Sequence, residues 1–268
     1  MVSGYTLGPN ARAAGTKLFV VDKTTSTNTD AKDHAQAGQY GPAWFVALEQ
    51  TAGYGRRGRT WVAPRGNLTA SVLVTLDVQP AVAATLGFVA GVAVQQALRS
   101  LSAEAAARGG AMLDFALKWP NDVLANARKM VGIGLEAHTL PAGLAVVVGI
   151  GVNNVAAPEG TPFPATSLSA EGLLLSAEDT FAALSDSWAD LFALWDNGRN
   201  FAAIRKLWLA SAYNLGGTVS VQLGERALEG VFEAIDETGC MIVATPQGRV
   251  PVTAGDVYFG TARSARAS

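Results

Sequence analysis

The chain has 268 residues, with 20 lysines and arginines against 22 aspartates and glutamates, and its formal net charge is −2. This near-neutral balance excludes a protein-wide basic field for nucleic acid, and the single Cys240 excludes an intrachain disulfide. With only His34 and His138 beside that cysteine, a structural Cys/His zinc site is excluded as well. At roughly 150 residues per domain, the length predicts about two domains.

Hydrophobic patterning predicts a mixed α/β domain over most of the chain. Apolar runs of strand length occupy residues 17–22, 44–48, 68–76, 115–118, 130–137 and 144–150. The last of these, LAVVVGI, is apolar throughout, so we expect both of its faces to be covered. Helix signals comprise a Thr/Ser-rich start leading into 31–37, a helix from Pro80 to about Leu101, and the segments 176–195 and 201–213.

The 21 residues between Asp77 and Arg99 carry no charge, which is long enough for a membrane span. Pro80 and several polar residues interrupt their apolar character, so we predict a buried core helix here. The first residues lack the charged start and apolar block of a secretion signal. We therefore predict a soluble, cytoplasmic protein with no membrane and no nucleic acid among its partners.

The pattern changes after Gly216. Short β-like runs at 219–223, 228–235, 241–244 and 250–252 are separated by glycines and a Pro246-Gln247-Gly248 turn. They predict a separate small β-barrel of about 50 residues, a size that is marginal alone. The predicted domains are thus 1–214 and 215–268, and the fold class is α+β, with a mixed β-sheet flanked by helices followed by the barrel.

A glycine- and arginine-rich loop is the most unusual segment. Four arginines fall within ten consecutive positions, namely Arg56, Arg57, Arg59 and Arg65. Residues 53–58 fit the dinucleotide pattern G-x-G-x-x-G, and 53–60 nearly fit the phosphate-loop pattern. Both patterns need a helix directly after the glycines, whereas a stretch containing tryptophan, proline and glycine follows here. Neither nucleotide motif therefore explains the loop.

A flexible loop with closely spaced guanidinium groups attracts polyphosphate, because glycine lets the backbone approach an anion and arginine forks onto its oxygens. Two alternatives stay open. The arginines can belong to a solvated surface loop. They can also contact nucleic acid, although no basic stripe continues from them. Arg65 has no role that the sequence assigns.

The segment Lys118-Trp119-Pro120-Asn121-Asp122 places one lysine at the end of an apolar strand. Because an unpaired buried ammonium is costly, Lys118 needs an anionic partner. Asp122 is that partner in a structural interpretation, and a substrate carboxylate with its phosphate is the partner in a functional one. In the functional interpretation Asn121 and Asp122 hold the turn or contact the ligand or its metal ion.

Pairs of glycines interrupt two of the predicted strands, at 132 and 134 and at 149 and 151, and Lys129 precedes the first pair. Glycine inside a strand indicates close approach of the backbone to a flat group. Strand bulges are an equally good interpretation.

These segments resemble those of the biotin protein ligases, over residues 17–259. The resemblance rests on Ser26-Thr27-Asn28, on residues 49–59 with Trp61, on 118–122 with Arg128, Lys129 and Gly132, and on 149–153. It implies a class II synthetase-like biotin/lipoate ligase catalytic domain with a C-terminal SH3-like barrel. It also implies an enzyme that forms biotinyl-5′-adenylate from biotin and ATP, then transfers biotin to a lysine of a carboxylase's biotin carboxyl carrier domain.

The family pattern further implies roles for individual residues. The implied catalytic residues are Lys118, Arg56 and Arg59. The implied biotin-binding residues are Ser26, Thr27, Asn28, Gln50, Tyr54, Gly55, Arg56, Lys118 and Gly132. The implied ATP- or adenylate-binding residues are Arg56, Arg59, Trp61, Asn121, Lys129 and Asn153. Magnesium is expected to arrive with ATP and not at a dedicated protein site, with Asn121 or Asp122 as candidate ligands.

The sequence departs from the family in two ways. The family usually writes Gly-Arg-Gly-Arg where this chain has Tyr54 between two glycines, so one permanent charge is missing from the loop. We expect that loop to close less tightly and to release the adenylate more readily. Only 16 residues precede Lys17, too few for the DNA-binding helix-turn-helix of some relatives, so we expect the enzyme without the repressor.

Two other functions remain as alternatives. A lipoate-type protein ligase shares the fold and the acyl-adenylate chemistry, and a non-catalytic nucleotide- or carrier-binding module could retain the fold. An exposed sheet edge is the expected site for the acceptor domain. The same edge could pair two copies of the chain, so the sequence allows a monomer or a homodimer.

Overall fold

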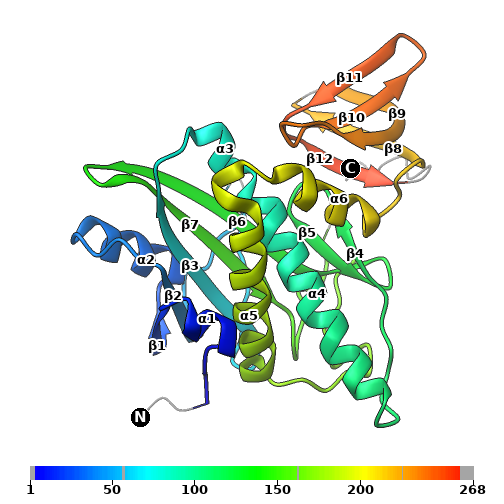
Figure 1. Ribbon diagram of the computed structural model, residues 1–268. Helices are drawn as coiled ribbons and strands as arrows, with labels where there is room; N and C mark the ends of the chain where they lie inside the picture. The colour runs from blue at the N-terminus through cyan, green and yellow to red at the C-terminus, as the bar shows by residue number, and fades with distance from the viewer. Residues whose placement is uncertain (1–3, 56–57, 162, 225, 260–268) are drawn as a thin grey trace.

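The computed structural model describes residues 4–55, 58–161, 163–224 and 226–259. Figure 1 shows a larger sheet with helices packed on it and a small β-domain at one end. The larger sheet has seven strands in the order β1-β2-β3-β7-β6-β5-β4. Only β1 and β2 pair in parallel, and the other neighbours are antiparallel. The predicted mixed sheet flanked by helices is therefore confirmed.

The bounds of these elements follow chain order. The strands of the larger sheet are β1 (Lys17–Thr24), β2 (Ala43–Gln50), β3 (Leu68–Leu76), β4 (Phe115–Lys118), β5 (Asp122–Ala125), β6 (Arg128–Leu140) and β7 (Gly143–Val152). The helices are α1 (Pro9–Ala13), α2 (Thr27–Gln36), α3 (Pro80–Ala84), α4 (Leu86–Ala106), α5 (Ala177–Trp195), the short 3-10 turn η2 (Asp196–Gly198) and α6 (Phe201–Ala210).

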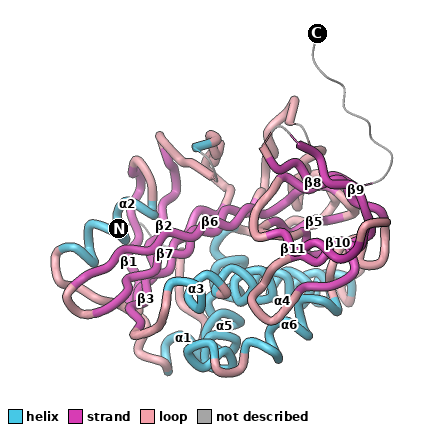
Figure 2. The backbone as a smooth tube through the Cα atoms, turned by 90° about the horizontal axis from the view of Figure 1, so that it is seen from above, coloured by secondary structure: helices cyan, strands magenta, loops and turns pink. Residues whose placement is uncertain are grey.

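Helices cover both faces of the sheet, with α2 on one side and α4, α5 and α6 on the other (Figure 2). Strand β7 separates two apolar cores because its side chains alternate between the faces. Val146, Val148 and Ile150 enter the larger core, whereas Ala145 and Val147 enter a smaller one beneath α2. The expectation that this apolar strand is covered on both faces is confirmed.

The uncharged stretch predicted as one core helix forms two. Residues Pro80–Ala106 are long and apolar enough to cross a membrane by length and composition, but 72% of the most apolar window is buried inside the fold. The break falls at Thr85, whose hydroxyl donates to the Val82 carbonyl at 2.6 Å and accepts from Trp195 Nε1 at 2.8 Å. A side chain that bonds its own preceding turn competes with helix continuation, which explains the break.

The small β-domain is a five-stranded antiparallel sheet in the order β11-β10-β9-β8-β12. Its strands are β8 (Thr218–Leu223), β9 (Arg226–Ile235), β10 (Met241–Thr245), β11 (Gly248–Val252) and β12 (Asp256–Phe259). The all-β C-terminal unit agrees with the SH3-like domain expected from the sequence. The boundary between residues 214 and 215 stays a prediction.

The two units touch through specific contacts. Trp119 Nε1 donates to the Gly239 carbonyl at 3.1 Å, and the rings of Tyr213 and Phe259 meet edge to face with centroids 4.9 Å apart. These contacts bring β12 beside the end of the larger sheet that carries Lys118. Strands β5 and β12, each four residues long, were not predicted from the sequence.

Candidate active site

A cavity of about 250 Å³ opens where the glycine- and arginine-rich loop crosses the larger sheet and faces β12. Every predicted site residue that the structure describes lines this cavity, namely Ser26, Thr27, Asn28, Gln50, Tyr54, Gly55, Arg59, Trp61, Lys118, Asn121, Asp122, Lys129, Gly132 and Asn153. Arg56 and Arg57 lie outside the described residues. The four segments that carry the family resemblance are thus brought together by the fold.

One half of the cavity is lined by neutral hydroxyls and amides, and we call it the neutral half, with Ser26, Thr27, Asn28 and Gln50. Gln50 Oε1 accepts from the Thr27 amide at 2.7 Å and from its hydroxyl at 3.0 Å. The Thr27 hydroxyl also lies 2.7 Å from Ser71 Oγ, which donates to Asn28 Oδ1 at 2.6 Å. Thr27 and Ser71 are buried, so this part of the wall is held rigidly.

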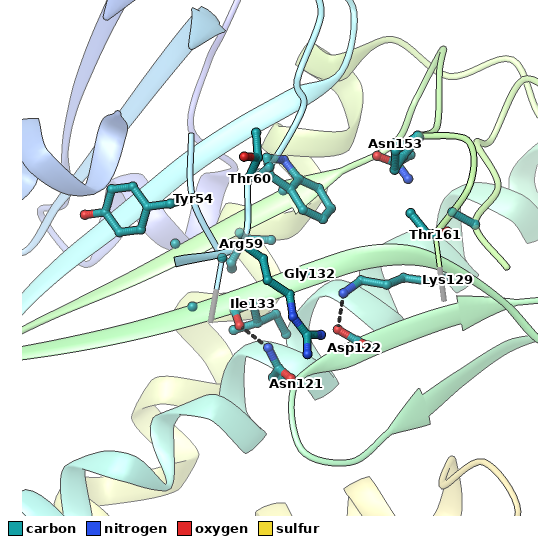
Figure 3. Close-up of a pocket in the computed structure, with 18 of the residues that line it drawn as sticks. Tyr54, Arg59, Thr60, Asn121, Asp122, Lys129, Gly132, Ile133, Asn153 and Thr161 are labelled. Carbon is teal, nitrogen blue, oxygen red and sulfur yellow. Dashed lines mark hydrogen bonds and ion pairs between the residues drawn. The ribbon is translucent and has the colours of Figure 1, made fainter. Parts of the chain in front are cut away.

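The other half carries positive charge, and we call it the cationic half, with Lys118, Lys129 and Arg59. Figure 3 shows Arg59 and Lys129 directed toward the same space, with Tyr54 at the opposite end. Lys118 is only 8% exposed, and its Nζ lies 4.0 Å from the centroid of the Phe163 ring. Burial lowers the pKa of Lys118, and nearby Asp122 opposes that shift.

Asp122 serves two lysines. It lies 3.9 Å from Lys118 Nζ and only 2.6 Å from Lys129 Nζ. The predicted pairing of Lys118 with Asp122 therefore exists, but the closer contact is to Lys129. Because both oxygens of Asp122 face ammonium groups, this carboxylate is poorly placed as a metal ligand. Asn121 Nδ2 donates to the Ile133 carbonyl at 2.6 Å, which secures the turn after Lys118.

The C-terminal domain contributes to the cavity through Gly255, Asp256, Val257 and Tyr258. Arg59 Nη2 lies 2.6 Å from Asp256 Oδ2, so the loop arginine expected at phosphate pairs here with a carboxylate of the small domain. This contribution was missed in the sequence, where the only signal was a β-branched and aromatic run, Val-Tyr-Phe, after Gly255 and Asp256. Asp256 therefore links the small domain to the cationic half.

The strand glycines of β6 and β7 face each other in register, as Gly132 opposite Gly151 and Gly134 opposite Gly149. This pairing runs without a register shift, so the bulge interpretation is wrong at these positions. A Cβ on Gly132 would lie 2.8 Å from Trp61, and one on Gly151 would lie 2.4 Å from it. The flat group that these two glycines admit is thus the Trp61 indole of the chain itself.

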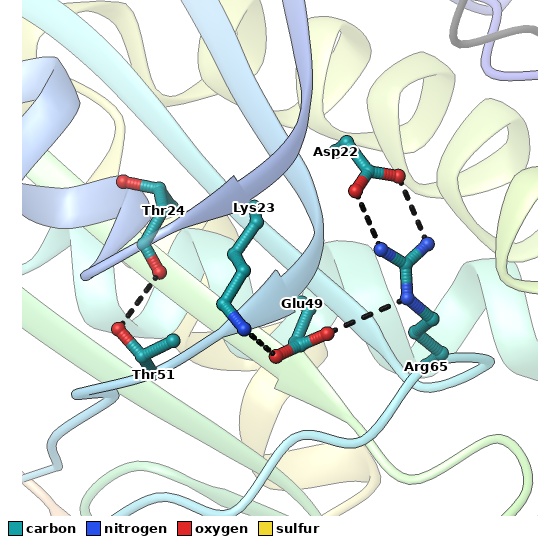
Figure 4. Close-up of polar contacts among 6 residues, drawn as sticks. All are labelled: Asp22, Lys23, Thr24, Glu49, Thr51 and Arg65. Carbon is teal, nitrogen blue, oxygen red and sulfur yellow. Dashed lines mark hydrogen bonds and ion pairs between the residues drawn. The ribbon is translucent and has the colours of Figure 1, made fainter.

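Arg65 lies outside this cavity and fastens the far end of the loop. Its guanidinium donates to both oxygens of Asp22 at 2.9 and 2.6 Å, and its Nε lies 3.4 Å from Glu49 Oε2 (Figure 4). Lys23 Nζ lies 2.6 Å from the other Glu49 oxygen. These contacts attach the loop to the ends of β1 and β2, which gives Arg65 a structural task.

Comparison with known families identifies the class of protein. Residues 18–153 match the model of the biotin/lipoate A/B protein ligase family, and residues 215–260 match that of the biotin protein ligase C-terminal domain. The chain therefore belongs to this family. The presence of both domains makes it, more particularly, a biotin protein ligase.

Individual relatives agree with this assignment. The chain is 40% identical to a biotin–[acetyl-CoA-carboxylase] ligase of Paracoccus denitrificans, over 89% of this chain and 98% of that one. It is 34% identical to a ligase of the same name from Mycobacterium tuberculosis, over 90% of this chain and 88% of that one. The fold matches a biotin protein ligase from Aquifex aeolicus in complex with biotin and ATP, with a TM-score of 0.73, 22% identity, and coverage of 91% and 99%.

Proposed function

We propose that this enzyme joins biotin to ATP as biotinyl-5′-adenylate and then transfers biotin to a lysine of a carboxyl carrier domain, such as that of acetyl-CoA carboxylase. The observation that carries the proposal is the division of one cavity into a neutral half and a cationic half. Hydroxyls and amides suit an uncharged ureido ring. Three cations, of which Lys118 is buried, suit a carboxylate and a phosphate that meet during the reaction.

In the first step a biotin carboxylate oxygen would form a bond to the α-phosphorus as the bond to the β-phosphate oxygen breaks and pyrophosphate leaves. Lys118 would contact both anions, and its charge acts strongly because the ammonium is buried. Arg59 would leave its ion pair with Asp256 and bind phosphate oxygens instead. Lys129 lines the same part of the cavity. The role assigned to Arg56 rests on the family pattern alone.

The adenine end of ATP has a candidate partner in Asn153. This side chain is 1% exposed, and its Nδ2 donates to the Thr166 carbonyl at 3.1 Å. Its Oδ1 has no hydrogen-bond partner among the residues that the structure describes. A buried unpaired acceptor is costly, so an amino group of the base would complete it. Trp61 would cover the adenylate from the loop.

We further propose that magnesium is held by the phosphates of ATP, where it would neutralise the charge of the leaving pyrophosphate. Within the described ranges no three His, Cys, Asp or Glu side chains gather into a metal-binding group. In the second step the acceptor lysine would attack the anhydride carbonyl and displace AMP. A cytoplasmic location and the absence of nucleic acid among the partners stay predictions, as does the choice between monomer and homodimer.

Pyrophosphate release in the absence of acceptor tests the reaction. We expect release with biotin and ATP and none with lipoate and ATP, followed by labelling of a carrier domain from the isolated adenylate. Release with lipoate alone would favour the lipoate-type ligase. Binding of ATP without release of pyrophosphate would favour the non-catalytic module.

A further inference from the structure

A carboxylate behind the cavity wall, Glu136 on β6, connects the loop to the neutral half. Its Oε1 accepts from Asn28 Nδ2 at 2.6 Å and from the Tyr54 hydroxyl at 3.0 Å. Its side chain is 29% exposed, and Glu136 is not among the residues that line the cavity. His138 Nε2 lies 3.8 Å from its other oxygen. Glu136 is therefore within reach of the loop and of the wall without facing the substrate space.

The wall contacts form a chain with a fixed direction. Ser71 has one hydroxyl proton and gives it to Asn28 Oδ1, so it accepts from Thr27. Asn28 in turn donates to Glu136. Glu136 accepts the Asn28 amide proton and so ends the chain, and this contact turns the Asn28 oxygen toward the Ser71 hydroxyl.

The direction of these hydrogen bonds determines which donors and acceptors the cavity offers to a ligand. The one hydroxyl proton of Thr27 lies within reach of Ser71 Oγ at 2.7 Å and of Gln50 Oε1 at 3.0 Å, and Thr27 Oγ1 keeps lone pairs that can accept from a ligand N–H. Gln50 Oε1 is occupied by the Thr27 amide, which leaves the Gln50 amide nitrogen to donate to a ligand carbonyl. An acceptor beside a donor complements a ureido group, which offers N–H and C=O. Hydrogen bonds to a charged acceptor are also stronger than neutral ones.

The local fold makes room for this arrangement. A Cβ on Gly149 would lie 2.3 Å from Asn28 Oδ1, so Asn28 keeps its position only beside a glycine. Tyr54 is 43% exposed, and the hydrogen bond to Glu136 ties its ring to β6. The same carboxylate oxygen thus serves the wall and the loop.

We propose that Glu136 is a positioning residue for biotin: through Asn28 it orients the donors and acceptors of the neutral half, and through Tyr54 it holds this part of the loop against β6. The inference rests on the proposed biotin ligase function. It assigns Tyr54 a partner that substitutes for the charge missing from this loop.

The test compares Glu136→Gln, Glu136→Ala, Tyr54→Phe and the Glu136→Ala/Tyr54→Phe double variant. The matched control is Glu233→Gln, a strand carboxylate paired with Arg249 in the small domain and 34% exposed. The readouts are biotin affinity, release of biotinyl-adenylate without acceptor, thermal stability and hydrogen exchange of residues 51–55 without ligand. We expect Tyr54→Phe to speed release about 3- to 10-fold, the range for one lost hydrogen bond.

Glu136→Ala should weaken biotin binding and speed adenylate release. Glu136→Gln should show smaller changes in both, because its side-chain carbonyl still accepts hydrogen bonds. The double variant should release adenylate no faster than Glu136→Ala, since both changes remove the same contact. Normal affinity and release in Glu136→Ala, or loss of stability alone, would overturn the inference. If the wild type makes no adenylate, the proposed function fails. In that case, faster exchange of 51–55 in Glu136→Ala and Tyr54→Phe still supports the loop contact, and unchanged exchange refutes it.

Discussion

The two halves of the cavity are suited to different ligand groups, one neutral and one anionic, and they use different side chains. The neutral half is held by a chain of hydrogen bonds through Thr27, Ser71 and Asn28, and its hydroxyls are buried. The cationic half is held by ion pairs that a substrate anion can replace, as Arg59 with Asp256 illustrates. Neutral recognition therefore needs rigidity, whereas anion binding benefits from partners that can exchange. The variants below test whether the halves separate in this way.

The largest effect is expected for Lys118→Ala. Removing a buried cation from the site where negative charge gathers should slow adenylate formation about 10²- to 10³-fold. Biotin affinity should fall far less, because the neutral half is untouched. Pyrophosphate release and calorimetric titration with biotin measure the two effects, with exposed Lys206→Ala as the control. Adenylation at the normal rate in Lys118→Ala would remove Lys118 from the catalytic assignment.

Thr27→Val should have the opposite effect, with a larger loss of biotin affinity than of adenylation rate. Loss of the buried hydroxyl leaves Ser71 and the ligand each without a partner, so biotin affinity should fall about 10-fold. Adenylation at saturating biotin should change little. KM and kcat for biotin separate the two effects, and Thr139→Val, on the exposed end of β6, is the matched control. A fall in kcat at unchanged KM would contradict the separation of the halves.

A pH dependence should belong to the cationic half alone. Burial lowers the pKa of Lys118, so its charge is present at low pH and is lost, as pH rises, below the range of an ordinary lysine. Affinity for a non-hydrolysable biotinyl-adenylate mimic should therefore decline with rising pH, by at most about tenfold per pH unit for one group. Lys118→Arg should abolish the decline, since arginine stays charged. A decline that persists in Lys118→Arg would assign it to another group.

How much could be predicted from the sequence differs between local patterns and contacts made across the fold. The long apolar strands and the four-residue β4 were predicted within a few residues because their patterns are apolar, whereas β5 and β12 are equally short but each begins with an aspartate, a residue depleted in strands. The predicted site residues that the structure describes all line one cavity. Glu136 was missed because it contacts Tyr54, 82 positions away, and Asp256 was missed because it contacts Arg59, 197 positions away. Strand register and domain packing bring these pairs together, and sequence spacing reveals neither. Trp61 over the glycines was missed for the same reason.

The smallest effect is expected at Tyr54, where the loop meets the neutral half. An arginine at this position could form a charge-assisted pair with Glu136 in place of the hydroxyl contact at 3.0 Å. Because exposed ion pairs contribute about 0.2–1 kcal/mol, Tyr54→Arg should slow adenylate release only about 2- to 5-fold. This slowing of adenylate release should vanish in a Glu136→Gln background and become smaller at high salt. Equal or faster release in Tyr54→Arg would mean that the lost charge is not what loosens this loop.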